Sequence, residues 1–590
     1  MRTLRHILIA CALTGISLGI VFAVGLWNFR TRALYTKDHA KIVLTDAAGA
    51  MKDMDPGRAG LYLTTLKDQL RALNATLSLW RQFVPFLDGA AAQLHAAQGL
   101  ADASVDVAQG LDYLKRNGAR LILNGKGPEF IAALKRLHKN IAAVAPTADK
   151  EQVYAAQTAI DAAIAWLDAG DAQNVVILFQ NPSEIRPGGG FLGSFAHITL
   201  NHASMTSLEV QDIYDPDGQM TQKIIPPVAL QRLTPNWGAR DANWFPDFPT
   251  SARKVMHFLE DSRIYRDRHV TFSGTIAINI TLLRDILDIT GPLEIPADDG
   301  TTMTLSADTF LADLQTDVET KQSKGILKQA TPALFAKLDT LDESQKKRLV
   351  EAVAARFANK DIMAYFRDPA LESFAKRMGA AGELYPTPPD FAGGYMSVAD
   401  ANIAGGKADA YTAQSIALDE TVNRDGTVAD ALTVVRAHHG GERAEPFYRA
   451  MNRTYMQILA APLSALSRIE GGYDRDIVPT LDYAKAGYAT DPDLAGDPGK
   501  AIFATWLDLE PGATKTISAS WTRNAGLSFD APRTPYRFVF DKQSGVNGPL
   551  DVTLHAPAGM LWTDSGTDTF AYHADNPPAR VTLDLTLMRR

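Results

Sequence analysis

The chain of 590 residues has a single cysteine, Cys11, and no concentration of charge of one sign. One cysteine excludes a disulfide framework, a CxxC zinc site, an iron–sulfur cluster and a thioredoxin-type motif. With 59 lysine and arginine residues against 67 aspartate and glutamate residues, the net charge is −8, which provides no basic surface for nucleic acid. We therefore exclude nucleic acid as a partner.

Long uncharged apolar runs are equally scarce, because only residues 7–27 form one. A single run excludes a transporter with many membrane spans. A helix of 21 residues, at about 1.5 Å per residue, is long enough to cross a hydrocarbon core of roughly 30 Å. Residues 1–32 are therefore predicted to be a signal anchor, a single span that leaves the bulk of the chain exported. A cleaved signal peptide that ends near 21–23 is the alternative.

Residues 33–170 have the period of amphipathic helices. Leucines recur at steps of three and four residues, which places them on one helix face; they are Leu63, Leu66, Leu70, Leu73 and Leu77. Glycine and proline residues interrupt such stripes. We predict a helical stalk here, an antiparallel bundle of several helices.

The pattern changes at residue 171, where strands begin to mix with helices. Residues 175–179 are a continuous apolar run, which is typical of a buried central strand. Strand patterns at 190–200 and 269–280 are followed by a short helical pattern at 282–289. This order predicts a mixed α/β (α+β) core across 171–400.

The last part of the chain, 401–590, is rich in strands that are apolar on one side. Tyr536, Phe538 and Phe540 alternate with polar residues, as expected for a half-buried strand. An antiparallel β-sandwich is the natural way to bury many such strands. The predicted fold is therefore multidomain: a signal-anchor helix, a helical stalk, a mixed core and a C-terminal sandwich.

Common catalytic motifs are incomplete. Gly188, Gly190 and Gly193 satisfy GxGxxG, but a strand pattern follows them where a dinucleotide site needs a helix. Ser251 and Lys254 match the SxxK of penicillin-recognising enzymes, without the accompanying KTG or SDN segments. A Ser251/Lys254 hydrolase is kept as a weak hypothesis, beside the interpretation of 249–251 as a capped helix start.

Two long motifs stand out in the core, NPSEIRPGGGFLGS at 181–194 and RDANWFPDFPTS at 240–251. They resemble the bacterial family known as domain of unknown function 4012, whose core carries an N-x-x-E-x-R-P-x-G-G-F-[IL]-G-S segment and an R-D-x-N-W-x-P-D-F-P-x-S segment. The resemblance continues to a segment at 402–409 and covers about 170–430. It implies a membrane-anchored envelope protein of the kind sometimes associated with exopolysaccharide production.

A fainter likeness connects residues 276–295 with the LytR-CpsA-Psr phosphotransferases. Those enzymes move glycopolymers from polyprenyl pyrophosphate to the cell wall, using arginines and acidic residues with a divalent metal. The turn at 290–292 departs from their Gly-Gly pair. This likeness implies a role in glycopolymer chemistry by analogy.

The residues of the two motifs suit an anionic ligand. Arg186 and Arg240 can each offer a guanidinium fork to pyrophosphate or an acidic sugar. Amides of the glycine-rich loop can add donors, and Asp241 or Asp247 can hold a divalent cation such as Mg²⁺. We predict that these groups converge on one cleft, with Asp241 and Asp247 as catalytic and metal-binding residues and with the ligand-binding residues Glu184, Arg186, Gly188, Gly189, Gly190, Arg240, Asn243 and Lys407.

The same charges have a structural interpretation. Glu184 with Arg186, and Arg240 with Asp241 or Asp247, would then be buried ion pairs that fix loops against the sheet. Trp237 and Trp244 also have two interpretations. Their rings either stack on sugar rings or fill the edge of a core.

These observations leave two main functions. The first is a single-pass protein of the bacterial cytoplasmic membrane, largely extracytoplasmic, that binds or transfers an anionic or polyprenyl-linked glycan. The second is a non-enzymatic scaffold that engages other envelope proteins. Convergence of the charged residues on an open cleft would favour the first.

Overall fold

The computed structural model describes residues 2–53, 55–82, 87–144, 150–296, 301–321, 325–388, 390–495 and 499–590, with side chains from residue 21 onward except at 26, 317–325, 327, 332 and 339. The chain forms two compact units. The first contains Met1–Ala172 and Leu200–Thr206, and the second contains Gln173–Thr199 and Ser207–Arg590.

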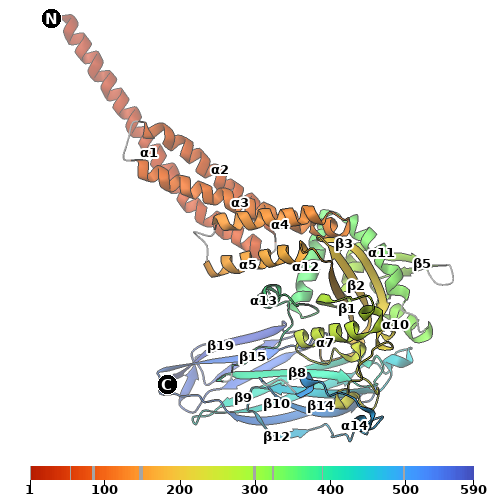
Figure 1. Ribbon diagram of the computed structural model, residues 1–590. Coiled ribbons are helices and arrows are strands. Elements are labelled where there is room, and N and C mark those ends of the chain that lie inside the picture. Colours follow the sequence, from red (N-terminus) through yellow and green to blue (C-terminus); the bar gives the residue numbers. More distant parts are fainter. Residues whose placement is uncertain are drawn as a thin grey trace. The chain divides into compact units, whose positions relative to one another are not determined.

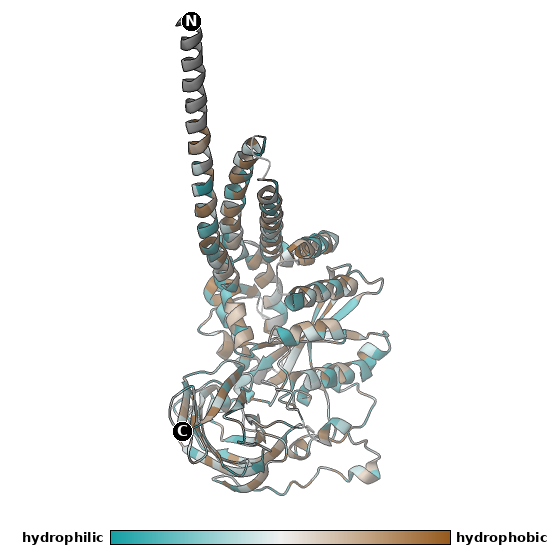
Figure 2. Ribbon diagram, turned by 90° about the vertical axis from the view of Figure 1, so that its left-hand side faces the viewer, coloured by the Kyte–Doolittle hydropathy of each residue, from teal (hydrophilic) through white to brown (hydrophobic). Residues whose placement is uncertain are grey.

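The first unit is a bundle in which each helix packs against the next along the chain (Figure 1). Its helices are α1 (Arg2–Lys52), α2 (Pro56–Arg81), α3 (Asp88–Leu123), α4 (Gly127–Val144) and α5 (Lys150–Leu167). The predicted leucine stripe of α2 is buried, and Leu66 and Leu70 share one apolar cluster with Val43 of α1 and Ala101 of α3. Figure 2 shows that these helices carry both polar and apolar residues. The predicted helical N-terminal region is confirmed.

The apolar run at 7–27 of the predicted signal anchor, residues 1–32, lies largely outside the residues whose side chains are described. Within the described part of the chain, no helix combines the length and the apolar character that a membrane crossing requires.

A five-stranded sheet forms the centre of the core in the second unit. Its strands lie in the order β3 (Ser204–Asp212), β2 (Phe191–Asn201), β1 (Gln173–Asn181), β4 (Phe272–Asn279) and β7 (Ile362–Phe366). β1 and β4 are parallel, whereas β4 and β7 are antiparallel. The apolar run at 175–179 lies in β1, at the middle of this sheet, as its continuous hydrophobicity predicts.

Helices cover both faces of this sheet, because successive side chains of a strand point to opposite sides. Ala277 of β4 joins an apolar cluster with α7 (Phe248–Asp261), whereas Ile276 and Ile278 pack with α9 (Thr281–Thr290) and α12 (Glu343–Ala358). The result is a three-layer α/β arrangement. The remaining helices and the small hairpin of this region are α6 (Tyr214–Asp217), α8 (Arg263–Arg266), α10 (Phe310–Lys321), α11 (Gly325–Asp339), α13 (Pro369–Arg377), β5 (Leu293–Pro296) and β6 (Thr302–Leu305).

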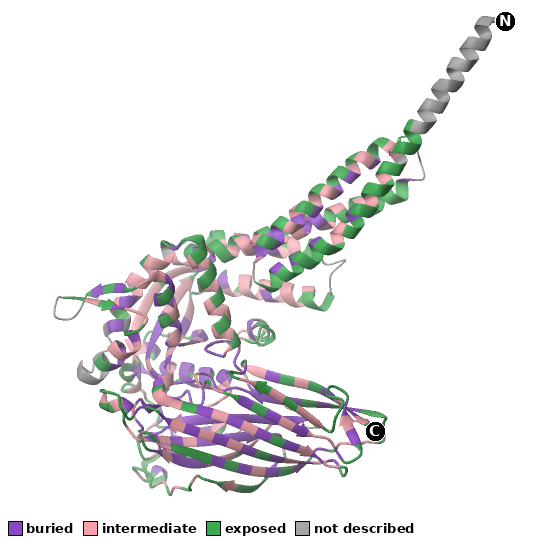
Figure 3. Ribbon diagram, turned by 180° about the vertical axis from the view of Figure 1, so that it is seen from behind, coloured by how far each residue is buried: buried purple, intermediate pink, exposed green. Residues whose placement is uncertain are grey.

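The C-terminal part is a sandwich of two six-stranded sheets. One has the order β12 (Ala465–Glu470), β14 (Thr514–Asn524), β10 (Thr427–His438), β9 (Thr412–Val422), β16 (Leu550–His555) and β18 (Thr569–Ala574). The other has the order β13 (Ala501–Leu509), β11 (Asn452–Ala460), β8 (Gly394–Asn402), β15 (Arg533–Asp541), β19 (Arg580–Arg589) and β17 (Met560–Trp562). Buried and exposed residues alternate along many of these strands (Figure 3).

Two details of the predicted sandwich need correction. The pairs β8–β15 and β9–β16 are parallel, so the sandwich is not purely antiparallel. The predicted boundary at 400 also falls inside β8, which belongs to the sandwich. All nine residues of β8 are buried, so this strand lacks the alternating pattern by which the other strands are recognised.

Candidate functional site

A cavity of about 430 Å³ lies beyond the carboxyl ends of the parallel strands β1 and β4. This is where ligands bind in open α/β sheets, because the loops that leave parallel strands diverge there. We call it the central cavity and define it by Glu184, Arg186, Arg240, Asp241 and Lys407. Its other walls come from β1, β2, α6 and α10.

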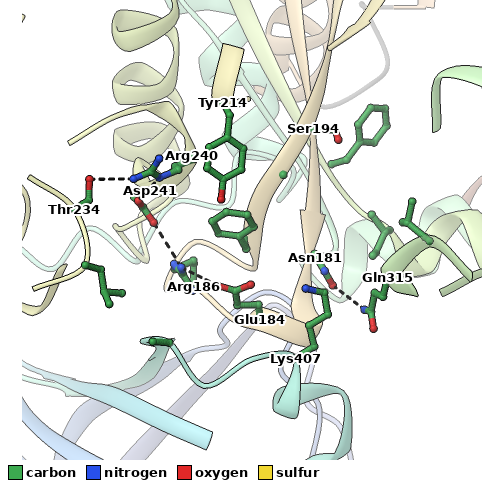
Figure 4. Close-up of a pocket in the computed structure, with 17 residues that line it drawn as sticks. Asn181, Glu184, Arg186, Ser194, Tyr214, Thr234, Arg240, Asp241, Gln315 and Lys407 are labelled. Carbon is green, nitrogen blue, oxygen red and sulfur yellow. Dashed lines mark hydrogen bonds and ion pairs between the residues drawn. The ribbon is translucent and has the colours of Figure 1, made fainter. Parts of the chain in front are cut away.

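Arg186 is the most enclosed charge of the central cavity, with only 3% of its surface exposed. Its Nη2 atom lies 3.1 Å from Glu184 Oε1 and 3.5 Å from Asp241 Oδ1 (Figure 4). Nη1 donates to the carbonyl of Asn402 at 2.6 Å, and the guanidinium lies 5.1 Å from the ring of Phe191. Nε has no hydrogen-bond partner among the described residues, so this buried cation keeps one unused donor.

Arg240 continues the charged row from the other side of Asp241. Its Nε atom lies 3.0 Å from Asp241 Oδ2, and its Nη2 donates to Thr234 Oγ1 at 3.0 Å. The guanidinium carbon lies 5.1 Å from the centre of the Tyr214 ring, within the range of a cation–π contact. Figure 4 shows the row from Glu184 through Arg186, Asp241 and Arg240 to Thr234.

Asp217 supports the turn that carries Arg240. Its carboxylate accepts hydrogen bonds from the backbone amides of Ala239 at 2.6 Å and Arg240 at 3.3 Å. Burial raises the pKa of Asp217 to about 6, although the positive charge of Arg240 opposes this shift. Asp217 thus has a structural role, as a support for the cavity wall.

The other lining residues of the central cavity are a third basic residue, neutral polar residues and apolar residues. Gln315 of α10 is buried and donates to Ser183 Oγ at 2.7 Å, while its Oε1 has no partner among the described residues. Lys407 comes from the loop between β8 and β9 and is only 8% exposed. Apolar wall residues are Phe179, Phe191, Leu233, Ile280 and Leu314. The cavity therefore combines three basic side chains and two carboxylates with an apolar wall.

The predicted role of the glycine loop is corrected. Gly188, Gly189 and Gly190 are buried and do not line the central cavity. The amide of Gly188 donates to the carbonyl of Asn243 at 3.1 Å, and that of Gly189 donates to the carbonyl of Arg186 at 2.8 Å. These two amides are therefore not free to hold an anion. The loop has a structural role instead, because it positions Arg186.

Asn243 has the same structural role, because its Nδ2 donates to the carbonyl of Gly190 at 2.8 Å. A Cβ atom on Gly188 would lie 2.0 Å from Asn243 Oδ1, so only glycine fits there. The two motifs thus interlock, and Asn243 positions the loop without lining the cavity.

Asp247 does not join Asp241, which corrects the prediction of a shared catalytic and metal site. It caps the N-terminus of α7, where Oδ2 accepts from the amide and hydroxyl of Thr250 at 3.1 and 2.6 Å. Its Oδ1 accepts from the amide of Leu384 at 3.1 Å. Asp241 faces Arg186 and Arg240, where a guanidinium takes the position that a cation would need.

The side chains present do not fit a divalent cation. The described residues contain no group of three or more histidine, cysteine, aspartate or glutamate side chains that could hold a metal ion. Hard cations such as Mg²⁺ need several oxygen ligands that are not already neutralised. We therefore derive no chemistry through a metal bound by Asp241.

Ser251 and Lys254 are engaged with different partners, which overturns the hydrolase hypothesis. Ser251 is 1% exposed and its hydroxyl donates to the carbonyl of Phe245 at 3.0 Å. Lys254 lies 2.6 Å from Asp491 and 2.7 Å from Asp493. A nucleophile needs a nearby base that is free to take its proton, and this pair does not provide one.

The segment at 402–409 packs directly on the first motif. The carboxylate of Asp409 accepts from the amide of Ile185 at 3.2 Å and from Nδ2 of Asn402 at 2.6 Å. It also forms an ion pair with the buried Arg436 at 3.0 Å. This network explains how Lys407, from the sandwich, reaches the same cavity as Arg186, from the core.

Several cavity residues were missed by the sequence analysis. Asn181 and Ser194 lie inside the first motif, and Asn181 is the last residue of β1, where a polar side chain was a usable signal. Tyr214 begins helix α6, outside both motifs. Thr234 and Gln315 had no local signal, because a single threonine or glutamine in a loop or helix is ordinary.

Residues 171–318 match the model of the family described as "Protein of unknown function (DUF4012)". Both motifs of the core lie inside this match, which confirms the resemblance that they carry. The matched segment supplies every lining residue of the central cavity except Ala404 and Lys407. A search of curated proteins found no match.

Similar solved structures include the Lin1025 protein from Listeria innocua, with 12% identity over 36% of this chain and 79% of that chain and a TM-score of 0.21. Protein gbs0355 from Streptococcus agalactiae has 12% identity over 36% of this chain and 74% of that chain, with a TM-score of 0.23. TagV from B. subtilis has 8% identity over 36% of this chain and 82% of that chain, with a TM-score of 0.22. At these TM-scores the likeness carries no argument about function.

Proposed function

We propose that the protein is a bacterial cell-envelope protein, anchored in the cytoplasmic membrane by residues 7–27 and largely extracytoplasmic, whose central cavity binds the anionic head of a lipid-linked glycopolymer during polysaccharide assembly. The observation that supports this proposal is the combination of three basic side chains with an apolar wall in one cavity. A pyrophosphate would face the basic groups, and the first part of a polyprenyl chain would contact the apolar wall.

An unused donor of Arg186 favours a ligand over a purely structural ion pair. Arg186 Nε is buried and lacks a partner among the described residues, and a buried unsatisfied donor costs about 1–3 kcal/mol. A pyrophosphate oxygen would satisfy it.

Binding, and not group transfer, is the activity that this geometry supports. Both oxygens of Asp241 face guanidinium groups, and Glu184 lies against Arg186. A general base must be free to accept a proton, and a carboxylate held by an arginine is a poor acceptor. The protein would then hold a lipid-linked glycan and present it to a partner.

The test uses the full chain in detergent and three probes: geranylgeranyl pyrophosphate, inorganic pyrophosphate and geranylgeraniol. We expect the pyrophosphate lipid to bind most tightly, because only it fills both walls. Lys407→Gln should weaken its binding at least about tenfold, since a hydrogen bond to a charged group contributes about 1.5–3 kcal/mol. Lys485→Gln is the matched control, because Lys485 has 87% of its side chain exposed and lies outside the cavity.

The scaffold alternative rests on the ion pairs that already engage Arg186. It predicts that none of the three probes binds, with or without Mg²⁺, and that envelope proteins co-purify equally with the wild type and Lys407→Gln. That result would overturn the proposed function. Equal binding of inorganic pyrophosphate and of the lipid would instead contradict the role of the apolar wall.

A further inference from the structure

A second, larger cavity of about 1110 Å³ lies in the same unit. We call it the second cavity and define it by Trp244, Phe245, Tyr385, Tyr455 and Gln457. Its walls come from the core loops at 225–231 and 244–250, from the segment at 383–387, and from strands β11 and β13 of the sandwich. Its volume exceeds the roughly 300–1,000 Å³ that is typical of small-molecule sites, so it suits a ligand of several linked units.

Four aromatic residues, Trp244, Phe245, Tyr385 and Tyr455, belong to its lining. The rings of Trp244 and Tyr455 are stacked, with centroids 6.0 Å apart and an angle of 17° between planes. Trp244 is buried, whereas Phe245, Tyr385 and Tyr455 are half-buried. Trp237, the other tryptophan that the sequence offered as a sugar platform, is fully buried and lies outside this cavity.

The charged side chains of the second cavity are all paired within the protein. Lys500 donates to the carbonyl of Tyr385 at 2.8 Å, and Asp493 lies 2.7 Å from Lys254. Lys376 lies 3.7 Å from Glu372, and Glu383 lies 3.7 Å from Arg580. Asp247 caps the N-terminus of α7. Asp493, Lys376 and Glu383 face opposite charges, whereas Lys500 and Asp247 hydrogen-bond to neutral groups. The rest of the lining, which is apolar and neutral polar, is the surface offered to a ligand.

One neutral donor is left without a partner. Gln457 is 9% exposed, and its Nε2 has no hydrogen-bond partner among the described residues. Its strand, β11, pairs on one edge with β8 and on the other with β13, so β11 offers side chains and no free backbone edge. At β11, recognition of a ligand therefore depends on side chains such as Gln457.

We infer that the second cavity binds a run of uncharged sugar residues in a glycan chain. The apolar C–H face of a sugar ring packs on an aromatic ring, and its hydroxyls accept from a neutral donor such as Gln457 Nε2. The cavity extends the proposed function, because residues 228–247 contribute to the linings of both cavities. A lipid-linked glycan would place its charged head in the central cavity and its neutral sugars in the second cavity.

The test uses the full chain in lauryldimethylamine oxide, a detergent without a sugar headgroup. The probes are four neutral hexasaccharides, namely cellohexaose, maltohexaose, mannohexaose and chitohexaose, and one hexaproline peptide. We expect at least one hexasaccharide to bind saturably. Val228→Trp places an indole at the cavity and should lower its affinity at least tenfold. Val478→Trp is the matched control, because both valines are exposed, at 64% and 77%, and Val478 lies outside the cavity.

Gln457→Leu separates a ligand contact from a structural role. Removing a buried unsatisfied amide should leave the melting temperature unchanged or raise it, while hexasaccharide affinity falls about fivefold. Binding of no hexasaccharide, binding that survives Val228→Trp, or binding of hexaproline alone would overturn the inference. Because these probes carry no pyrophosphate, such a failure leaves geranylgeranyl pyrophosphate binding intact, whereas failure of the proposed function abolishes that binding.

Discussion

The central cavity and the second cavity share the segment at 228–247 but use their charges differently. In the central cavity, Arg186 and Arg240 line the open space and are paired with Asp241 at 3.5 and 3.0 Å. In the second cavity, Asp493 and Glu383 are neutralised by Lys254 and Arg580. In the central cavity the cations of these pairs line the open space, whereas in the second cavity the carboxylates line it and their cations lie outside the lining.

A charged residue near a cavity therefore indicates a binding site only when its partners within the protein are also considered. Lys254 and Lys407 are both buried lysines, but Lys254 lies between two aspartates whereas Lys407 lines a cavity that has more basic groups than carboxylates. Variants that change one cavity should therefore leave the other unaffected, unless the change unfolds the second unit.

Lys254→Met should have the largest effect on stability. It leaves Asp491, whose side chain is 6% exposed, without its cation, and loss of one partner of a buried pair costs about 3–5 kcal/mol. Thermal or urea unfolding measures this loss. Lys376→Met is the control, because Lys376 is half exposed and its pair with Glu372 contributes at most about 1 kcal/mol. Equal stability of Lys254→Met and the wild type would contradict a stabilising role of the buried pair between Lys254 and Asp491.

Gly189→Ala, in the glycine loop that positions Arg186, should lower the free energy of unfolding by about 3–4 kcal/mol. The loss comes from overpacking and backbone strain together. Gly189 has φ of +123°, and an added Cβ would lie 2.5 Å from Ser544 Oγ and 2.6 Å from Gln180 Oε1. Gly487→Ala separates the two causes, because Gly487 has φ of +69° in open space and should lose only about 1 kcal/mol. Equal losses in the two variants would show that the contacts of Gly189 are not tight.

Most of the fold could be predicted because it follows local periods. The leucines of α2 repeat at helical spacing, and Tyr536, Phe538 and Phe540 alternate along β15; the structure buries both sets. β8 escaped detection, because a strand buried on both faces has no alternation. The parallel pairing of β8 with β15 could not be predicted either, since these strands are far apart in the sequence.

The candidate site could be predicted only where the motifs bring their own residues together. Arg186, Arg240 and Asp241 do converge, as their motifs suggested. Asp247 was wrongly added, although its position three residues before Thr250 is the spacing of a helix cap. Gln315 could not be found at all, because its place in the cavity depends on the packing of α10 and on no local pattern.

Asp217→Asn should reveal a pH dependence that belongs to the central cavity alone. The folded protein binds the proton of Asp217 more tightly than the unfolded chain does, because its pKa is raised from 3.8 to about 6. Stability of the wild type relative to the variant should therefore fall as the pH rises from about 4 to about 6, by about 2 kcal/mol in view of partial solvent screening. Urea unfolding at several pH values measures it.

Asp215→Asn is the matched control for this prediction, because Asp215 lies in the same short helix α6 but is exposed. It should follow the wild type at every pH. A constant difference between the wild type and Asp217→Asn from pH 4 to pH 7 would contradict the buried, proton-binding role of Asp217.

Raising the salt concentration should weaken ligand binding in the central cavity more than in the second cavity. This is the smallest effect that we predict. Raising NaCl from 0.1 to 1 M shortens the Debye length from about 10 Å to about 3 Å, which weakens attraction between an anion and partly exposed cations such as Arg240. We expect geranylgeranyl pyrophosphate to bind the full chain about threefold more weakly at the higher salt. Hexasaccharide binding should change less than twofold, because the charges around the second cavity are compensated within the protein. A hexasaccharide that loses affinity in parallel with the pyrophosphate lipid would mean that both ligands occupy the charged cavity, since neutral contacts with rings and amides have no reason to respond to ionic strength.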